Sequence, residues 1–141
     1  MSQENVGIVR RTVAAFNEGG IEAVAQFAHP EIEFQEPPTQ PAPRAARGLE
    51  ETRDTFTSFD EAWEEHQSEI KEIRELPGDE VLLSTVEHFR GRDGMELDAG
   101  CWTIYTFREN KIIKFRPFWD RAQALEAAGL SEQAMPEEGT P

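Results

Sequence analysis

Residues 81–119 read VLLSTVEHFRGRDGMELDAGCWTIYTFRENKIIKFRPFW, and this stretch decides the fold of the chain. Polar and apolar residues alternate over 81–90, 95–108 and 111–119, which is typical of β-strands. The turn sequence GRDG separates the first two strands, and the dipeptide EN makes a tight turn into the third. The stretch therefore predicts three consecutive strands paired as an antiparallel meander.

Two further strands are predicted on the N-terminal side of this stretch. Residues 66–76 alternate in the same way and are closed by Pro77-Gly78-Asp79. Ile32 and Phe34 alternate with polar neighbours in a shorter strand, which Pro37-Pro38 ends. The Pro-, Ala- and Arg-rich stretch that follows is expected to be a loop.

Helices are expected at both ends of the strand region. Apolar residues of the first segment recur at spacings of three and four up to Gly19-Gly20, and a short helix follows from Ile21 to a point before Pro30. A third helix carries Leu49, Thr52, Phe56, Phe59 and Trp63 on one face, and a closing helix starts at Asp120 and ends at Gly129. The element order predicts an α+β fold, in which a curved antiparallel sheet, like half of a cone, wraps on the N-terminal helices and encloses one pocket.

Length and charge limit the classes of function. The 141 residues fit one domain, assigned to 1–130, followed by a polar tail at 131–141 that is expected to be disordered. The formal net charge of −14 disfavours binding to nucleic acid or to anionic membrane surfaces. The one cysteine, Cys101, suits a reducing cytoplasm, and no apolar run is long enough to span a membrane.

Three stretches resemble one known family. They are AAFNEGGIEAVAQFAHPEIEFQEPP, RGLEETRDTF and TFRENKIIKFRPFWDRAQALEAAGL, which together span about residues 3–130. They resemble the nuclear-transport-factor-2-like superfamily, in its SnoaL-like polyketide cyclase and ketosteroid isomerase branch. The resemblance implies the cone-like fold, a small hydrophobic or cyclic ligand, and a homodimer formed through the sheet, but it does not imply one reaction, because the superfamily includes isomerases, cyclases, hydrolases and non-catalytic binders.

Glu36 is the first candidate catalytic residue. Strand alternation points it to the same side as Ile32 and Phe34, where burial would raise its pKa and make it a proton-shuttling base. It also matches the carboxylate before proline that the resemblance assigns to the general base of ketosteroid isomerases. The alternative is that the strand ends at Pro37 and Glu36 turns to solvent. The resemblance would also place a tyrosine at Thr12 and an acid at Thr103, and this chain has a weaker donor at both.

His88 and Asp120 are the candidate helpers. His88 shares one strand face with Ser84 and Val86, which the resemblance places on the pocket, and it titrates near neutral pH. The alternative is a histidine on the dimer-facing side of the sheet. Asp120 lies where SnoaL-like cyclases carry an acid/base aspartate, but Asp120 and Gln123 also form a signal for capping a helix.

The remaining candidates are ligand-binding residues. Thr103 is a candidate hydrogen-bond donor, and Trp119 matches a pocket-lining tryptophan of the isomerases. The expected lining is Phe16, Trp63, Ser84, Val86, Thr103, Tyr105 and Trp119. No cofactor or metal is expected, because the three histidines lack metal-ligand spacing.

Two functions stay open at this stage, beside a third reading in which the chain is a dimeric scaffold whose cavity is filled by its own side chains. One is a cofactor-independent isomerase, cyclase or hydrolase that acts on a small cyclic hydrophobic metabolite by carboxylate acid/base chemistry. The other is a ligand-binding or accessory dimeric domain with the same pocket and no turnover. An epoxide-hydrolase set of Glu87, Arg90 and Asp98 is set aside, because strand alternation gives no reason for the three to converge.

Overall fold

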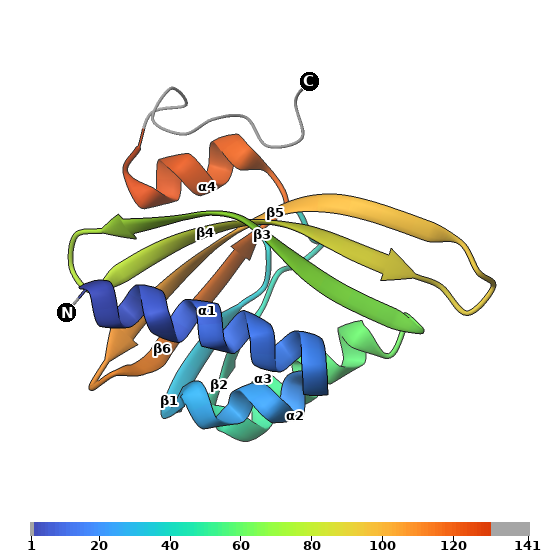
Figure 1. Ribbon diagram of the computed structural model, residues 1–141, viewed down its shortest axis with the longest axis horizontal. Helices are drawn as coiled ribbons and strands as arrows, with labels where there is room; N and C mark the ends of the chain where they lie inside the picture. The colour runs from blue at the N-terminus through green and yellow to red at the C-terminus, as the bar shows by residue number, and fades with distance from the viewer. Residues whose placement is uncertain (1, 131–141) are drawn as a thin grey trace.

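A computed structural model of the chain describes residues 2–130 (Figure 1). Its helices are α1 (Ser2–Gly19), α2 (Ile21–Val24), the 3-10 turn η1 (Ala25–Phe27), α3 (Gly48–Asp60) and α4 (Arg121–Ala128). Its strands are β1 (Ala28–Gln35), β2 (Ala45–Arg47), β3 (Glu65–Leu76), β4 (Glu80–Arg90), β5 (Glu96–Arg108) and β6 (Lys111–Phe118).

The strands lie in one sheet in the order β2-β1-β6-β5-β4-β3. β3 to β6 form the antiparallel meander that the sequence predicts, and Glu109 and Asn110 turn from β5 to β6 with positive φ angles of 54° and 63°. β1 pairs in parallel with β6, with Phe34 opposite Phe115. The α+β class is confirmed, with the refinement that the sheet contains this parallel pair.

Irregular pairing curves the sheet. The register shifts between Ile70 and Glu72 where β3 pairs with β4, and between Thr106 and Phe107 where β5 pairs with β6. Such bulges bend a strand and increase its twist. The sheet is therefore curved and unclosed, with one face turned toward α1, α2 and α3 (Figure 1).

The two faces of the sheet pack against different helices (Figure 1). On the helix-covered face, Val81 and Tyr105 belong to a buried cluster with Val9 of α1. On the opposite face, Leu82 belongs to a second buried cluster with Leu125 of α4. Because successive residues of a strand point to opposite faces, this pattern assigns each strand residue to one side.

The boundaries differ from the predicted ones in three places. α3 ends at Asp60, so Trp63 lies in the connection to β3 and not on the helix. β1 begins at Ala28 and includes Pro30, which is tolerated because the pairing with β6 is irregular between Ala28 and Glu33. Residues 45–47 of the expected loop form β2.

Two expectations concern the chain ends and membranes. The tail predicted at 131–141 lies outside the described residues. Within residues 2–130, none of the helices combines the length and the apolar character needed to cross a bilayer.

Candidate functional site

The side chain of His66 joins the end of α3 to the sheet. Its Nδ1 lies 2.6 Å from Oδ1 of Asp60, the last residue of α3, and its Nε2 lies 2.6 Å from Oε1 of Glu87 on β4. The side chains of His66 and Glu87 are 7% and 9% exposed, and that of Asp60 is 25% exposed. We call this mostly buried chain of hydrogen bonds, Asp60–His66–Glu87, the His66 chain.

Strand pairing brings the two sheet residues together. β3 and β4 pair so that His66 is opposite Phe89 and Ser68 is opposite Glu87. Alternation along β4 puts Glu87 on the same face as Val81, which packs against α1. The register therefore places an imidazole and a carboxylate next to each other on the helix-covered face.

Three donors stabilise the charged form of Glu87. Its Oε1 accepts hydrogen bonds from Nε2 of His66 and from Oγ of Ser68, both at 2.6 Å, and its Oε2 accepts one from the hydroxyl of Thr85. Burial by itself would raise the pKa of Glu87, but these hydrogen bonds outweigh it and hold the pKa below its ordinary value. Glu87 is therefore a carboxylate at neutral pH.

The same contacts stabilise the protonated form of His66. Burial by itself would lower the pKa of His66, but the hydrogen bonds with Asp60 and Glu87 raise it to about 9. At neutral pH the ring is an imidazolium, and each N–H donates to one carboxylate. Neither ring nitrogen is left as a metal ligand, in agreement with the absence of any metal-binding group of His, Cys, Asp and Glu within residues 2–130.

Aromatic rings surround the imidazolium. The ring centroid of His66 lies 4.4 Å from that of Phe89, 4.8 Å from that of Phe16 and 6.2 Å from that of Phe59. Phe16, Phe59 and Phe89 in turn contact Phe56, Trp63 and Trp119. The three rings around His66 and these three neighbours form one set: Phe16, Phe56, Phe59, Trp63, Phe89 and Trp119. We call this set the aromatic layer.

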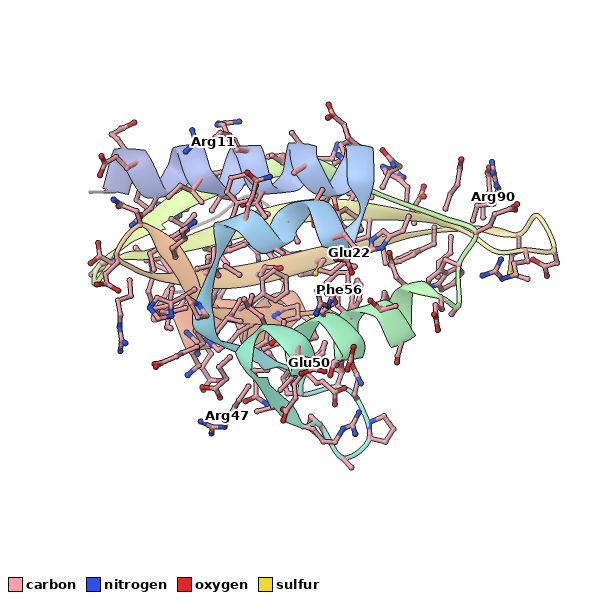
Figure 2. All side chains as sticks on the ribbon, turned by 90° about the horizontal axis from the view of Figure 1, so that it is seen from below. Arg11, Glu22, Arg47, Glu50, Phe56 and Arg90 are labelled. Carbon is pink, nitrogen blue, oxygen red and sulfur yellow. The ribbon has the colours of Figure 1, made fainter. Side chains whose placement is uncertain are left out.

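The aromatic layer lies between the helices and the sheet. Figure 2 shows Phe56 between α3 and the sheet, where its ring also contacts Phe34 of β1 and Phe115 of β6. Phe59 is 41% exposed, and the layer as a whole is partly exposed except for the buried Phe89.

Tyr105 contributes a second polar group to the helix-covered face. The residue is 4% exposed, and among residues 2–130 no group makes a hydrogen bond with its hydroxyl. Burial, with a contribution from the charge of Glu87, raises the pKa of Tyr105, so the phenol stays protonated. The hydroxyl oxygen is not among the fully buried, unpartnered polar atoms of residues 2–130, so solvent reaches it, and a ligand oxygen can replace that solvent.

Cys101 and Thr103 lie on the same face of β5 as Tyr105. The Cys101 sulfur is 3.7 Å from Oγ1 of Thr103. Burial raises the pKa of Cys101 to about 12, so the side chain is a thiol and not a nucleophilic thiolate.

Glu36 lies just after β1, and its side chain is 11% exposed. Its Oε1 accepts a hydrogen bond from the backbone N–H of Arg44 at 2.9 Å, and its Oε2 lies 3.5 Å from the Arg44 guanidinium. The side chain thus closes the loop between β1 and β2 and lines a hollow of about 240 Å³ beside Glu51 and Asp54. A catalytic role for Glu36 stays a prediction.

His88 has the opposite orientation to the one expected. With Ser84 and Val86 it lies on the strand face of Leu82, which packs toward α4 and away from the aromatic layer. Its ring nitrogens lie 2.8 Å from Oδ1 of Asp98 and 2.9 Å from Oε1 of Glu69, and its side chain is 41% exposed. These carboxylates raise the pKa of His88 at the surface of the sheet.

Asp120 caps α4. Its Oδ2 accepts a hydrogen bond from the backbone N–H of Gln123 at 2.9 Å, as the capping alternative predicts. Among the described residues, no hydrogen bond or ion pair joins any two of Glu36, His88 and Asp120. Of the expected ligand-binding residues, Phe16, Trp63 and Trp119 belong to the aromatic layer, and Thr103 and Tyr105 lie on the helix-covered face.

The residues of the His66 chain are absent from the catalytic set predicted from sequence. Glu87 was considered there only with Arg90 and Asp98, and His66 only as a metal ligand. The signal that points to them is alternation on two paired strands: His66 and Ser68 share one face of β3, and Glu87 lies on the matching face of β4. Asp60 joins them because α3 ends there.

Comparisons with known proteins agree with this architecture. A family model described as "SnoaL-like domain" matches residues 9–115. No curated protein sequence matches the chain.

Solved structures with the same fold have low sequence identity. Bal32a, from a soil-derived mobile gene cassette, is 19% identical, with a TM-score of 0.74 over 90% of this chain and 97% of that one. SalBIII, an epoxide hydrolase/cyclase-like enzyme with a role in pyran ring formation in salinomycin, is also 19% identical. Its TM-score is 0.71 over 85% of this chain and 93% of that one. A hypothetical protein with a ketosteroid isomerase-like fold from Catenulispora acidiphila, in complex with trimethylamine, is 16% identical, with a TM-score of 0.68 over 92% of this chain and 97% of that one.

Proposed function

The chain belongs to the SnoaL-like domain family, and from this premise we propose that it is a cofactor-independent acid/base enzyme for a small cyclic, hydrophobic molecule. Glu87 is the proton acceptor, His66 is the proton donor, and Asp60 positions His66. One observation carries the proposal: a carboxylate and an imidazole lie 2.6 Å apart beneath the aromatic layer.

The shifted pKa values support separate roles for the two groups. The pKa of Glu87 is held below its ordinary value and that of His66 is raised to about 9, so at neutral pH one group can accept a proton and the other can give one. Asp60 keeps the imidazole ring protonated and fixes its orientation.

The surroundings suit a small hydrophobic substrate that carries an oxygen. The rings of the aromatic layer favour a flat or cyclic apolar body. The unpartnered Tyr105 hydroxyl donates a hydrogen bond to the substrate oxygen on which negative charge develops. Glu87 removes a proton from the neighbouring carbon, and His66 gives its own proton to a different atom of the substrate. The proton on Glu87 then passes to His66 across their hydrogen bond, so no external acid, base or cofactor is consumed.

Deuterium incorporation tests this function. Small cyclic ketones, lactones and aromatic polyketide-like compounds are incubated with the protein in heavy water and analysed by mass spectrometry. The wild type is expected to speed deuterium uptake at a carbon next to the carbonyl, and Glu87→Gln to lower that rate by about 100-fold or more, as for loss of a general base.

His88→Gln is the matched control, because His88 also contacts two carboxylates but lies on the opposite face of the sheet. It should leave the uptake rate unchanged. Thermal unfolding of both variants checks that each is folded. Uptake that survives in a folded Glu87→Gln variant would overturn the proposed role of Glu87.

A second function is non-catalytic binding of an organic cation. The observation in its favour is that two carboxylates, Asp60 and Glu87, face one imidazolium beside the partly exposed aromatic layer, and aromatic faces attract cations. The neighbour from Catenulispora acidiphila holds trimethylamine. Tetramethylammonium should then raise the melting temperature while neutral tert-butanol does not, with no deuterium uptake by any compound of the panel.

A further inference from the structure

A groove at the other end of the molecule has a different chemistry from the aromatic layer. It lies between the N-terminal half of α1, η1 and the turn from β5 to β6, and has a volume of about 440 Å³. Figure 1 shows the start of α1 and this turn at the end of the molecule opposite the β4–β5 hairpin, and Figure 2 shows Arg11 far along the long axis from Arg90 of that hairpin. We call it the Arg11 groove.

Two positive charges of the Arg11 groove have no carboxylate partner among residues 2–130. Arg11 makes no hydrogen bond or ion pair with any of these residues, and Lys111 donates from Nζ to the backbone oxygen of Gln26 at 2.6 Å. Most arginines of this acidic chain do contact a carboxylate, namely Arg44, Arg47, Arg53, Arg90, Arg108 and Arg116. Glu4 also lines the groove, so its lining carries two positive charges and one negative charge.

The shape of the groove depends on a glycine inside a helix. Gly7 lies within α1, where glycine is less favourable than alanine by about 1 kcal/mol. A Cβ atom built at Gly7 would lie 3.3 Å from Nη1 of Arg11, so the guanidinium folds back over this position. The missing side chain leaves this position to the guanidinium of Arg11, which therefore lies against α1 at the wall of the groove.

The groove also has an apolar floor. Ile8 of α1 is buried, and Phe27 of η1 is partly buried. The volume lies in the range of small-molecule sites, which is about 300 to 1,000 Å³. Amide side chains of Gln3, Gln26 and Asn110 line the rim and add hydrogen-bonding groups.

We propose that the Arg11 groove binds a small carboxylate that carries a short apolar tail. The carboxylate pairs with the planar fork of Arg11 and with Nζ of Lys111, and the tail covers Ile8 and Phe27. An inorganic anion would contact only the charged groups of Arg11 and Lys111. A neutral or cationic amphiphile would contact only the apolar floor of Ile8 and Phe27. This site is independent of the His66 chain and of the proposed acid/base function.

Titration of the full chain with hexanoate tests the proposal, with hexanol, hexylammonium and inorganic phosphate as comparison probes. Binding is followed by calorimetry and by amide NMR shifts. Hexanoate is expected to bind more tightly than each of the other three and to shift the amides of residues 3–11, 26–27 and 109–111. Arg11→Gln is expected to weaken hexanoate binding about 10-fold to 100-fold, the loss typical of a charge-assisted hydrogen bond.

Arg10→Gln is the matched control, because Arg10 is the adjacent arginine of α1 but does not line the groove. It removes the same charge and should leave the affinity within about twofold, as expected for a screened surface charge. Phe27→Ala should remove part of the apolar floor and weaken hexanoate binding while phosphate binding is unchanged. Equal losses in Arg10→Gln and Arg11→Gln, phosphate binding as tight as hexanoate binding, or no hexanoate binding at all would overturn the proposal.

Discussion

Glu36 and Glu87 are both buried carboxylates, but their partners differ in origin. Glu36 receives hydrogen bonds from the backbone and side chain of Arg44, only eight residues away, and the Arg44 side chain is 79% exposed. Glu87 receives hydrogen bonds from two strands and contacts, through His66, the end of α3. Local partners of this kind close a loop, whereas the partners of Glu87 hold an ionised group inside the fold.

The raised pKa of His66 predicts a pH-dependent stability. A group with a raised folded-state pKa contributes stability that is fully present below its ordinary pKa of 6.5 and is lost as the pH rises through about 9. The lowered pKa of Glu87 acts in the opposite sense, because its contribution is present above the ordinary carboxyl pKa and is lost as the pH falls. The free energy of unfolding should therefore be highest at mildly acidic pH.

Urea unfolding between pH 6 and pH 10 measures the His66 part. The wild type is expected to lose up to about 3 kcal/mol over this range, from the shift of His66. The free energy of unfolding of His66→Gln should be lower than that of the wild type at pH 6 and should fall much less by pH 10. His88→Gln should change the slope far less, because solvent screens the ion pairs of this exposed side chain. A wild-type slope in His66→Gln would contradict the assignment.

Among the helices and strands, the sequence predicts the ones that are defined by signals within a short stretch of residues. Alternation and the turns at 91–94 and 109–110 are local, so the β4–β6 meander is predicted well. The parallel pairing of β1 with β6 is not, because it joins residues about 80 positions apart, as for Phe34 and Phe115. β2 is too short, at three residues, to give a pattern.

The candidate site is less predictable than the elements for the same reason. His66, Glu87 and Asp60 come together only when the register of β3 with β4 and the end point of α3 are both fixed. Neither is encoded within a short window of residues. The aromatic residues could be assigned to the interior because apolar spacing is local, and Phe16, Trp63 and Trp119 do lie in the aromatic layer.

The cap of α4 gives a prediction at the element scale. Asp120→Ala removes the acceptor for the Gln123 N–H and should lower the free energy of unfolding by about 1 kcal/mol, as for loss of an N-cap. Chemical denaturation measures this change. Asp120→Asn keeps an acceptor oxygen and should retain most of the stability, and a full loss in Asp120→Asn would argue against the capping role.

On the scale of the whole molecule, two candidate sites with different side-chain chemistry lie in different parts of the fold. The His66 chain and the aromatic layer lie near the end of α3, and the Arg11 groove lies at the N-terminal end of α1 (Figure 1). A net charge of −14 repels anions from most of the surface. We therefore expect a neutral or cationic hydrophobic ligand at the aromatic layer and an anionic ligand in the Arg11 groove.

The central claim is that Glu87, and not Glu36, is the working base. Proton abstraction from a nitrobenzisoxazole tests it most directly, because this compound opens to a coloured cyanophenolate when a buried base removes its ring proton. We predict that the wild type accelerates the reaction above buffer, that Glu36→Gln keeps this rate, and that Glu87→Gln lowers it about 100-fold or more. Loss of the rate in a folded Glu36→Gln variant with the rate retained in Glu87→Gln, or no acceleration by the wild type, would contradict the account.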